Sequence, residues 1–332
     1  MSIKYTSLKY QSLEACASLS HIQSEHHHRL RQLRCGQFIH YAIEPGSLEM
    51  HINRANWCGL KTCPICTSVR TAKLRGRLFQ GLPRLLADYP TATFLFLTLT
   101  VKNCHFGQLR ACVRTMEQGW KRFTNTNIFS ATAIGFLKSL EVTRPRDYYY
   151  RGYFVGRYAG YKADRCFEYF QQQPNWDYSR WRSHACEEVH PHFHVLLMVP
   201  SSYFTPGNYL NQEDWQNLWR RSARLDYDPI VDIRAVKKLN NGILEISKYT
   251  VKPTDMTDVY GCLTIRQLHG LRLTAIGGVF SDYFSQKAVD AIAQTGRAGT
   301  EHWQNGVPCW YEWDGEEYSL TRLANLEWEL SR

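Results

Sequence analysis

The sequence reads His190-Pro191-His192-Phe193-His194-Val195-Leu196-Leu197-Met198-Val199, and this stretch has the alternating pattern of a β-strand. Because neighbouring side chains of a strand point to opposite faces, the histidines share one face and the apolar residues between them form the other. Alternate residues lie about 6.8 Å apart along a strand. Two adjacent imidazoles can therefore bind one metal ion while the opposite face packs into a core. The alternative is a half-exposed strand whose histidines bind nothing, but the pattern favours a metal-binding strand.

Further strand patterns lie at residues 93–101, 134–143, 230–236 and 268–280, and helical patterns lie at residues 106–123 and 214–224. The 93–101 segment alternates Thr98 and Thr100 with leucines, which is typical of a central strand. In the 134–143 segment, Glu141 stands among apolar neighbours. A buried carboxylate without a partner is costly, so we expect a cation or metal beside Glu141 unless this position is exposed.

A group of cysteines near the N-terminus has the spacing of a zinc site. The knuckle Cys63-Pro-Ile-Cys66 turns tightly enough for both thiolates to face one ion, and Cys58 and Cys35 can complete the tetrahedral shell of a structural Zn²⁺. The alternative is a thioredoxin-like redox pair, which the additional cysteines and the missing βαβ pattern disfavour. A basic amphipathic helix is expected over residues 68–79, either in contact with phosphates or as a solvated face.

The composition is that of a folded protein with a polyanionic partner. Of the 332 residues, 44% are apolar and 21% are charged, a balance that excludes intrinsic disorder. The net charge of +10 and the aromatic content of 14% suit a nucleic acid with unpaired bases. The sequence has no apolar run long enough to cross a membrane and begins with no apolar leader, so we expect a cytoplasmic protein without a membrane partner.

Residues 144–188 are rich in both aromatic and basic side chains. The aromatic residues are Tyr148, Tyr149, Tyr150, Tyr153, Tyr158, Tyr161, Tyr169, Trp176, Tyr178 and Trp181, and the basic residues are Arg144, Arg146, Arg151, Arg157, Lys162, Arg165, Arg180 and Arg182. Such a mixture can stack bases and pair with phosphates. It can equally be an ordered hairpin whose rings pack on each other, and contact with nucleic acid is the favoured interpretation.

Residues 242–252 are expected to form a helix that ends before Pro253. Glu245, Tyr249 and Lys252 are spaced to share one face of this helix. A tyrosine that attacks a phosphodiester stays joined to one DNA end and leaves a free hydroxyl on the other. A divalent ion held by imidazole and carboxylate would polarise the phosphodiester. Lys252 would neutralise phosphate charge, and Glu245 would either activate water or act as a structural acid.

These segments resemble the plasmid rolling-circle replication initiators of the HUH endonuclease superfamily. Phe96-Leu-Thr-Leu-Thr100 is similar to the first motif of that family, the 190–197 stretch to the second, and Tyr249-x-x-Lys252 to the third. The Glu245-x-x-x-Tyr249 spacing resembles the branch with a single tyrosine. The Cys58-x4-Cys63-Pro-x-Cys66 element and Gly277-Gly278-Val-Phe280 also resemble that branch, and the likeness covers residues 35–285.

The resemblance implies an α+β fold with a central antiparallel β-sheet flanked by helices, like that of HUH endonucleases and RRM-like domains, together with an N-terminal zinc-binding element. It implies that His192 and His194 bind a catalytic Mg²⁺ or Mn²⁺ with Glu141 as third ligand, and that His190 lies behind the ligands or faces DNA. The segment between Glu141 and His190 is longer than the usual hairpin of the family, which bears on the alignment of Glu141.

The expected domains are residues 1–90 with the zinc element and the basic helix, residues 91–285 as the endonuclease domain with the 144–188 insertion, and residues 286–332 as a C-terminal tail. The resemblance implies an enzyme that nicks and joins DNA at a plasmid origin, single-stranded or in a hairpin, through a 5′-phosphotyrosine. Host helicase and polymerase are its expected partners.

Other functions remain open at this point. An HUH transposase or a relaxase would use the same chemistry on other DNA. A zinc-stabilised DNA-binding regulator would bind DNA without cutting it and would leave the shared face of Glu245, Tyr249 and Lys252 unexplained. A zinc hydrolase is disfavoured because the chain lacks an H-E-x-x-H motif.

Overall fold

The computed structural model describes residues 3–21, 26–43, 50–158, 161–247, 258–285 and 307–323. The chain forms two compact units, and each is described here by itself. The first unit comprises Met1–Gly81, Met256–Cys262 and Phe284–Arg332, and the second comprises Leu82–Asp255 and Leu263–Tyr283. The division expected at residue 90 lies instead between residues 81 and 82, inside helix α3 (Pro64–Asp88), which contains the expected basic helix.

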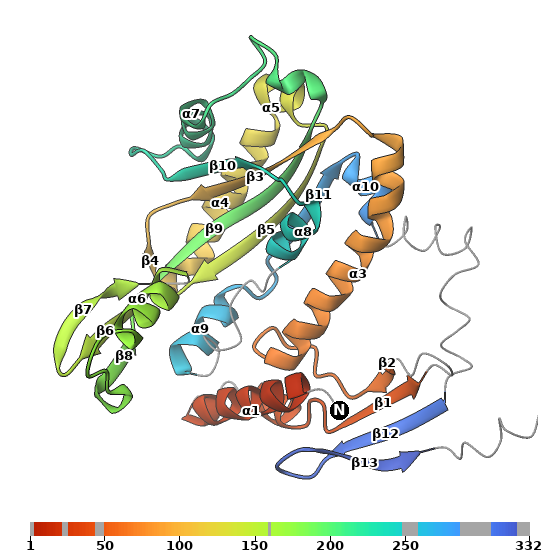
Figure 1. Ribbon diagram of the computed structural model, residues 1–332, viewed down its shortest axis with the longest axis vertical. Coiled ribbons are helices and arrows are strands. Elements are labelled where there is room, and N and C mark those ends of the chain that lie inside the picture. Colours follow the sequence, from red (N-terminus) through yellow and green to blue (C-terminus); the bar gives the residue numbers. More distant parts are fainter. Residues whose placement is uncertain are drawn as a thin grey trace, which may run out of the picture. The chain divides into compact units, whose positions relative to one another are not determined.

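The second unit is built on a six-stranded antiparallel sheet. Its main strand order is β10 (Val231–Ala235), β3 (Thr93–Thr100), β9 (Glu188–Val199), β5 (Gly135–Thr143) and β11 (Thr274–Gly278), and the short β4 (Cys104–His105) pairs with β9. The stretch that carries the histidines is thus the central strand (Figure 1). The predicted α+β fold with an antiparallel sheet flanked by helices is confirmed.

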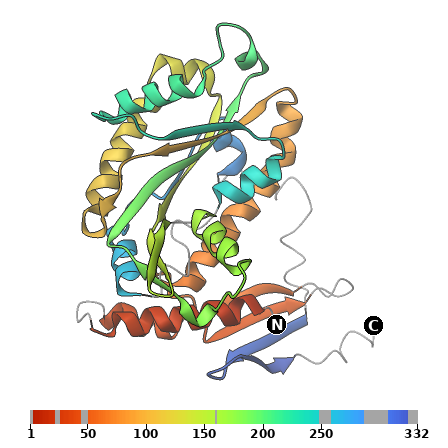
Figure 2. The ribbon, with the colours of Figure 1, turned by 60° about the vertical axis from the view of Figure 1, so that its left-hand side comes forward.

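Helices lie on both faces of this sheet. Helix α4 (Leu109–Thr124) and helix α7 (Gln212–Ala223) cover the apolar face of β9, where the ring of Phe193 packs against Trp120 and Trp219. Helix α8 (Leu239–Ile246) lies on the opposite face, as Figure 2 shows. A Cβ atom at Gly242 of α8 would lie only 3.1 Å from a methyl carbon of Val236. It would also lie 3.5 Å from a methyl carbon of Leu196, which shares the histidine face of β9, so the missing side chain lets α8 lie close to that face.

Shorter elements complete the second unit. They are η3 (Phe106–Gln108), α5 (Asn127–Thr132), η5 (Ser201–Phe204) and, where the chain passes between the two units, α9 (Val259–Gln267) and α10 (Phe280–Phe284). None of the described helices is both long and apolar enough to cross a membrane.

The expected insertion after residue 143 forms a layer of its own. It contains β6 (Arg146–Tyr150), β7 (Tyr153–Tyr158), α6 (Tyr161–Gln171), η4 (Tyr178–Arg180) and β8 (Trp181–Ala185). The three strands pair antiparallel in the order β7-β6-β8. In Figure 1 this layer extends from the ends of β5 and β9, since those two strands flank it in the sequence.

The first unit contains a four-stranded sheet in the order β13-β12-β1-β2, formed by β1 (Phe38–Ile43), β2 (Met50–Ala55), β12 (Val307–Trp313) and β13 (Tyr318–Leu323). Helices α1 (Ile3–Ser18), η1 (Leu19–His21) and α2 (His26–Leu33) precede it. The segment expected as a separate tail therefore supplies two strands to this sheet. Its rings at Trp313 and Tyr318 are buried with Ile39 and Tyr41 of the N-terminal region, so their burial depends on a partner distant in sequence.

Candidate functional site

The register of the central sheet brings the expected metal-binding side chains together. His192 on β9 lies opposite Glu141 on β5 and opposite Thr100 on β3, and His194 lies opposite Thr98. One ligand atom from each of Glu141, His192 and His194 lies within 4.8 Å of the others. The structure therefore unites in one group the three side chains that the sequence proposed as ligands.

Each imidazole of this group is oriented by a second hydrogen bond. The main-chain oxygen of His190 lies 3.2 Å from Nδ1 of His192, and Oγ1 of Thr98 lies 3.2 Å from Nδ1 of His194. Each ring can donate its Nδ1–H to that oxygen, and with an ion bound the lone pair of Nε2 would then face the ion on the side where Glu141 lies. Thr98 was part of the predicted strand, but its contact with His194 emerges only from the pairing of β3 with β9.

The distances within the group suit a divalent ion. Oε2 of Glu141 lies 2.8 Å from Nε2 of His194 and 3.6 Å from Nε2 of His192. Adjacent ligands of an ion bound at about 2.1 Å are roughly 3.0 Å apart. The donor set of two imidazole nitrogens and one carboxylate oxygen fits manganese and other transition metals well, and it leaves further coordination positions open.

The charge of Glu141 is favoured by its neighbours. Burial alone would raise the pKa of this carboxyl group, but hydrogen bonds and charge interactions with His192 and His194 outweigh burial and hold the pKa well below its usual range. Burial also lowers the pKa of His190 to about 4, with a contribution from His192. His190 is therefore neutral at pH 7, and it does not belong to the group of three potential ligands.

A groove of about 650 Å³ lies beside His194. Phe96 and Thr98 line it from β3, and Glu245 lines it from α8. The exposed side chains of Lys237 and Lys238, which begin one residue after the end of β10, also line it. Sequence reasoning missed these lysines, although their position after a predicted strand end was visible. The groove thus combines a potential ion site with cations that can contact phosphates.

The remaining catalytic candidates fall in different parts of the chain. Glu245 lies on α8, whose described helix ends at Ile246. Tyr249 and Lys252 lie outside the described residues, so their expected shared face with Glu245 stays a prediction.

The four expected zinc ligands also meet, in the first unit. The sulfur of Cys35 lies 3.5 Å from those of Cys63 and Cys66, and the sulfur of Cys58 lies 3.6 Å from that of Cys66. Sulfur atoms around a tetrahedral zinc with bonds of about 2.3 Å are roughly 3.8 Å apart. The main-chain N–H of Gly59, a residue at φ +74°, donates to the sulfur of Cys66. This geometry fits a structural Zn²⁺.

A buried cation lies beside these thiols. Lys9 is 1% exposed, and its Nζ donates to the main-chain oxygens of Leu33 at 3.0 Å and Cys35 at 2.7 Å. Burial lowers the pKa of Lys9, whereas the nearby cysteines act in the opposite direction. A zinc ion bound by four thiolates carries net negative charge, so a protonated Lys9 would compensate it. Nothing in the sequence around Lys9 indicated this role, because its partners are fixed only by folding.

The chain is similar in sequence to known replication proteins. A family model described as "Replication protein" matches residues 49–319. "Protein rep" of Streptococcus pneumoniae serotype 2 (strain D39 / NCTC 7466) is 32% identical over 259 residues, which are 75% of this chain and 68% of that protein. "Protein rep" of Lactiplantibacillus plantarum is 28% identical over 262 residues, which are 74% of this chain and 70% of that protein.

A "Replication protein" of Staphylococcus aureus is 28% identical over 222 residues, which are 62% of this chain and 78% of that protein. In two Bacillus relatives the matched region covers 66% and 60% of the relative's length, so the chain spans about two thirds of several relatives. No solved structure matches the chain significantly. The family model covers most of the chain, and the resemblance predicted from the sequence is confirmed at this level: the chain belongs to the family of replication proteins.

Proposed function

We propose that the chain is a metal-dependent endonuclease that nicks and rejoins DNA at a plasmid origin and thereby starts rolling-circle replication. The observation that carries this proposal is the group of Glu141, His192 and His194 beside a groove lined by Lys237 and Lys238. Membership of the replication protein family agrees with it. The proposal implies a cytoplasmic protein with host helicase and polymerase as partners.

In this proposal each group of the groove has a distinct task. Glu141, His192 and His194 would hold Mg²⁺ or Mn²⁺, which when bound polarises a phosphodiester. Lys237 and Lys238 bind the neighbouring phosphates of the strand, a contribution that depends on salt but not on base sequence.

Tyr249 is the proposed nucleophile. Only two residues separate it from the end of α8 in the sequence, and Glu245 of that helix lines the groove. The phenol oxygen forms a bond to phosphorus as the bond to the 3′ oxygen breaks. The phenol proton passes to solvent or a nearby base, and the leaving 3′ oxygen takes up a proton from solvent. The products are a 5′-phosphotyrosine and a free 3′-hydroxyl, which conserve the energy of the phosphodiester for rejoining.

Glu245 and Lys252 complete the proposed machinery. Glu245 takes a proton from water when the phosphotyrosine is finally hydrolysed, so its task follows the first cleavage. Lys252 neutralises charge on the phosphate near Tyr249. A protein without this chemistry, such as a zinc-stabilised regulator, would bind the same DNA and never become joined to it.

The test is mass analysis of the protein after incubation with a single-stranded origin oligonucleotide and Mn²⁺. We expect an adduct on the peptide that contains Tyr249, no adduct with Tyr249→Phe, and an unchanged adduct with the control Tyr209→Phe, whose ring is exposed elsewhere in the same unit. An adduct that persists in Tyr249→Phe would exclude this nucleophile. Binding without any adduct in the wild-type protein would favour the regulator.

Glu245→Ala separates the two steps. It should still form the adduct, whereas release of the DNA by hydrolysis should fail. Loss of both steps would instead indicate a structural role for Glu245.

A further inference from the structure

The aromatic residues of the 144–188 insertion fall into two groups. One group packs internally: the rings of Tyr150 and Trp176 are stacked with centroids 5.0 Å apart, and Phe170 and Trp181 lie 5.5 Å apart in the same cluster. These contacts give the small layer its core. The expected self-packing of the insertion therefore accounts for part of its aromatic content.

The second group remains exposed. Tyr153 is 79% exposed, Phe154 and Tyr169 are each 60% exposed, and Tyr178 is 70% exposed. Burial of such rings is a main source of stability in small domains. Large apolar side chains that stay on the surface together indicate an interaction site.

Three of these exposed rings border a groove of about 790 Å³ in the insertion. Tyr153 and Phe154 line it from β7, and Tyr169 lines it from α6. Arg151, Lys162 and Arg165 line the same groove, and none of its described lining residues is acidic. Planar rings among cations suit a ligand that is flat and negatively charged along its length.

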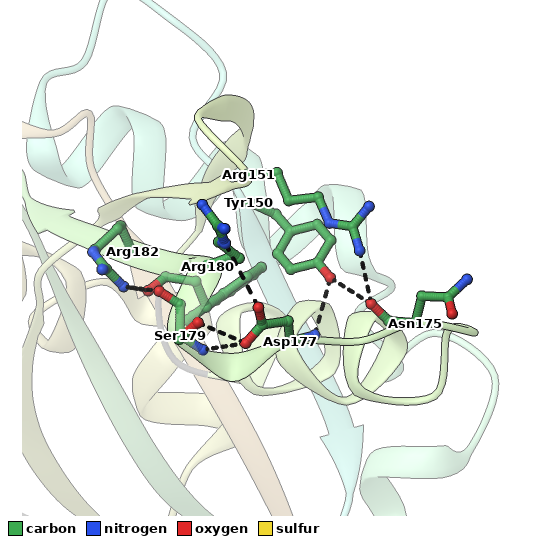
Figure 3. Close-up of polar contacts among 8 residues, drawn as sticks. Tyr150, Arg151, Asn175, Asp177, Ser179, Arg180 and Arg182 are labelled. Carbon is green, nitrogen blue, oxygen red and sulfur yellow. Dashed lines mark hydrogen bonds and ion pairs between the residues drawn. The ribbon is translucent and has the colours of Figure 1, made fainter.

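Arg151 is held at the rim in an unusual conformation. It occupies the two-residue turn between β6 and β7 with Gly152, at φ +50° and +84° respectively. Asparagine is the favoured residue at the first position of such a turn, so arginine adopts this conformation at an energetic cost. Figure 3 shows its guanidinium beside Asn175, where Nη2 donates to the main-chain oxygen at 2.9 Å. This hydrogen-bond partner is neutral, and the charge of Arg151 acts on the carboxylate of Asp177 only at longer range.

The neighbouring Arg180 has the same carboxylate within ion-pair distance. Nε of Arg180 lies 3.6 Å from a carboxylate oxygen of Asp177, so its charge is partly matched (Figure 3).

The insertion is also joined directly to the metal-binding strands. It leaves β5 after Thr143, two residues beyond Glu141, and returns at the start of β9, before His192. The main-chain N–H of Cys186 donates to the oxygen of Pro145 at 3.0 Å and closes its base. A strand bound by the insertion would thus lie at the same end of β5 and β9 as the ligands.

We propose that this groove binds unpaired nucleotides of the origin strand, with bases stacked on Tyr153, Phe154 and Tyr169 and phosphates beside Arg151, Lys162 and Arg165. This inference rests on the proposed function, because it takes DNA as the partner. It adds a second site, which holds the strand outside the groove where cleavage occurs and selects single-stranded over duplex DNA.

The test measures binding of the full chain to a fluorescent single-stranded oligonucleotide in EDTA, where no cleavage occurs. Tyr153→Ala with Phe154→Ala should weaken binding at least about tenfold, because each stacked base contributes substantially to affinity. The matched control is Phe204→Ala with Tyr209→Ala, an exposed pair of the same types, at 49% and 56% exposure, outside the insertion. The control should bind like the wild-type protein, and the affinity for duplex should change little in either variant.

Arg151→Asn is a second variant that tests the phosphate contact without disturbing the fold, since asparagine suits the turn. This variant should remain at least as stable as the wild-type protein, and yet the slope of log affinity against log salt should become shallower by about 0.7, the value for one phosphate contact on a single strand.

Three results would overturn the inference. These are unchanged single-strand binding in the Tyr153 and Phe154 variant, an equal loss for single strand and duplex, or a loss of binding to an acidic peptide without a loss for the oligonucleotide. Failure of the proposed function has a different signature: single-strand binding that depends on the groove, in a protein that never forms the covalent adduct.

Discussion

The two groups of potential metal ligands differ in how the protein surrounds them. The sulfur ligands of the first unit belong to residues that are 0 to 7% exposed, and main-chain N–H groups donate to them. On the same measure His192 is 8% exposed, whereas Glu141 and His194 are partly exposed, and His194 lines a groove. Four ligands in a closed shell suit a structural ion, and three ligands with an open side suit an ion that meets substrate.

The largest effect is expected when a ligand is removed from the closed group, the four cysteines of the first unit. Cys63→Ser removes a fully buried ligand, so the first unit should lose its zinc and, with it, its cooperative unfolding transition, because zinc binding supplies folding energy. Elemental analysis and thermal unfolding of the purified protein measure both. Cys166→Ser, at a partly exposed cysteine outside the group, should retain one zinc per chain. Full zinc content in Cys63→Ser would show that this group does not hold the ion.

Removal of ligands from the open group, which is Glu141, His192 and His194, should reduce the rate of the reaction more than the stability of the fold. His192→Ala with His194→Ala should reduce metal-dependent nicking by at least about a thousandfold, since it removes two of three ligands. The unfolding temperature in EDTA should fall by only a few degrees, because the opposite face of β9 remains packed. His105→Ala, at a half-exposed histidine paired with Glu187, is the control and should nick normally. Wild-type nicking in the double variant would exclude these histidines as ligands.

A smaller effect on the open group is expected from its supporting hydroxyl. Thr98→Val keeps the shape of the side chain but removes the acceptor for Nδ1 of His194. Loss of such a partner weakens metal affinity or activity by about 10- to 100-fold. The Mn²⁺ concentration that gives half-maximal nicking should therefore rise, whereas Thr115→Val on the exposed side of α4 should leave it unchanged. Identical Mn²⁺ curves for both variants would mean that His194 needs no such support.

The smallest effect should come from the cation beside the closed group. Lys9→Met removes a positive charge near the thiolates and leaves the oxygens of Leu33 and Cys35 without this donor. We expect zinc to be lost to a chelator about tenfold faster, a change that corresponds to roughly 1.4 kcal/mol. The control is Lys73→Met on the exposed face of α3. If the two variants release zinc at the same rate, Lys9 does not compensate the charge of the site.

Much of the fold was predictable because local patterns agreed with tertiary structure. The strands at residues 93–101 and 134–143 are found as β3 and β5, and the histidine stretch is found as β9, because each combines alternation with a strongly apolar face. The cost of burying a carboxylate predicted a cation or metal beside Glu141, and the family resemblance implied that Glu141 lies with His192, as the register of β5 and β9 shows.

Features that depend on distant pairing were not predictable. The strands β12 and β13 carry exposed as well as buried positions, and only the pairing of β12 with β1 and with β13 explains the burial of Trp313. Lys138 is a further example: it is fully buried on β5, and its Nζ lies 2.5 Å from Glu117 of α4. The two residues lie in separate elements of the sequence. No local pattern indicates that β5 and α4 pack together with Lys138 beside Glu117.

The long connection between β5 and β9 can change in length and sequence without moving the potential metal ligands. The two strands pair continuously from Gly135 opposite Met198 to Thr143 opposite His190, so this ladder sets the separation of Glu141 and His192. The entropy of closing a loop rises only slowly, by about 0.6 kcal/mol for each doubling of its length. We therefore expect the intervening segment to behave as an exchangeable module: it can be replaced to change which strand is captured while the ligands keep their places.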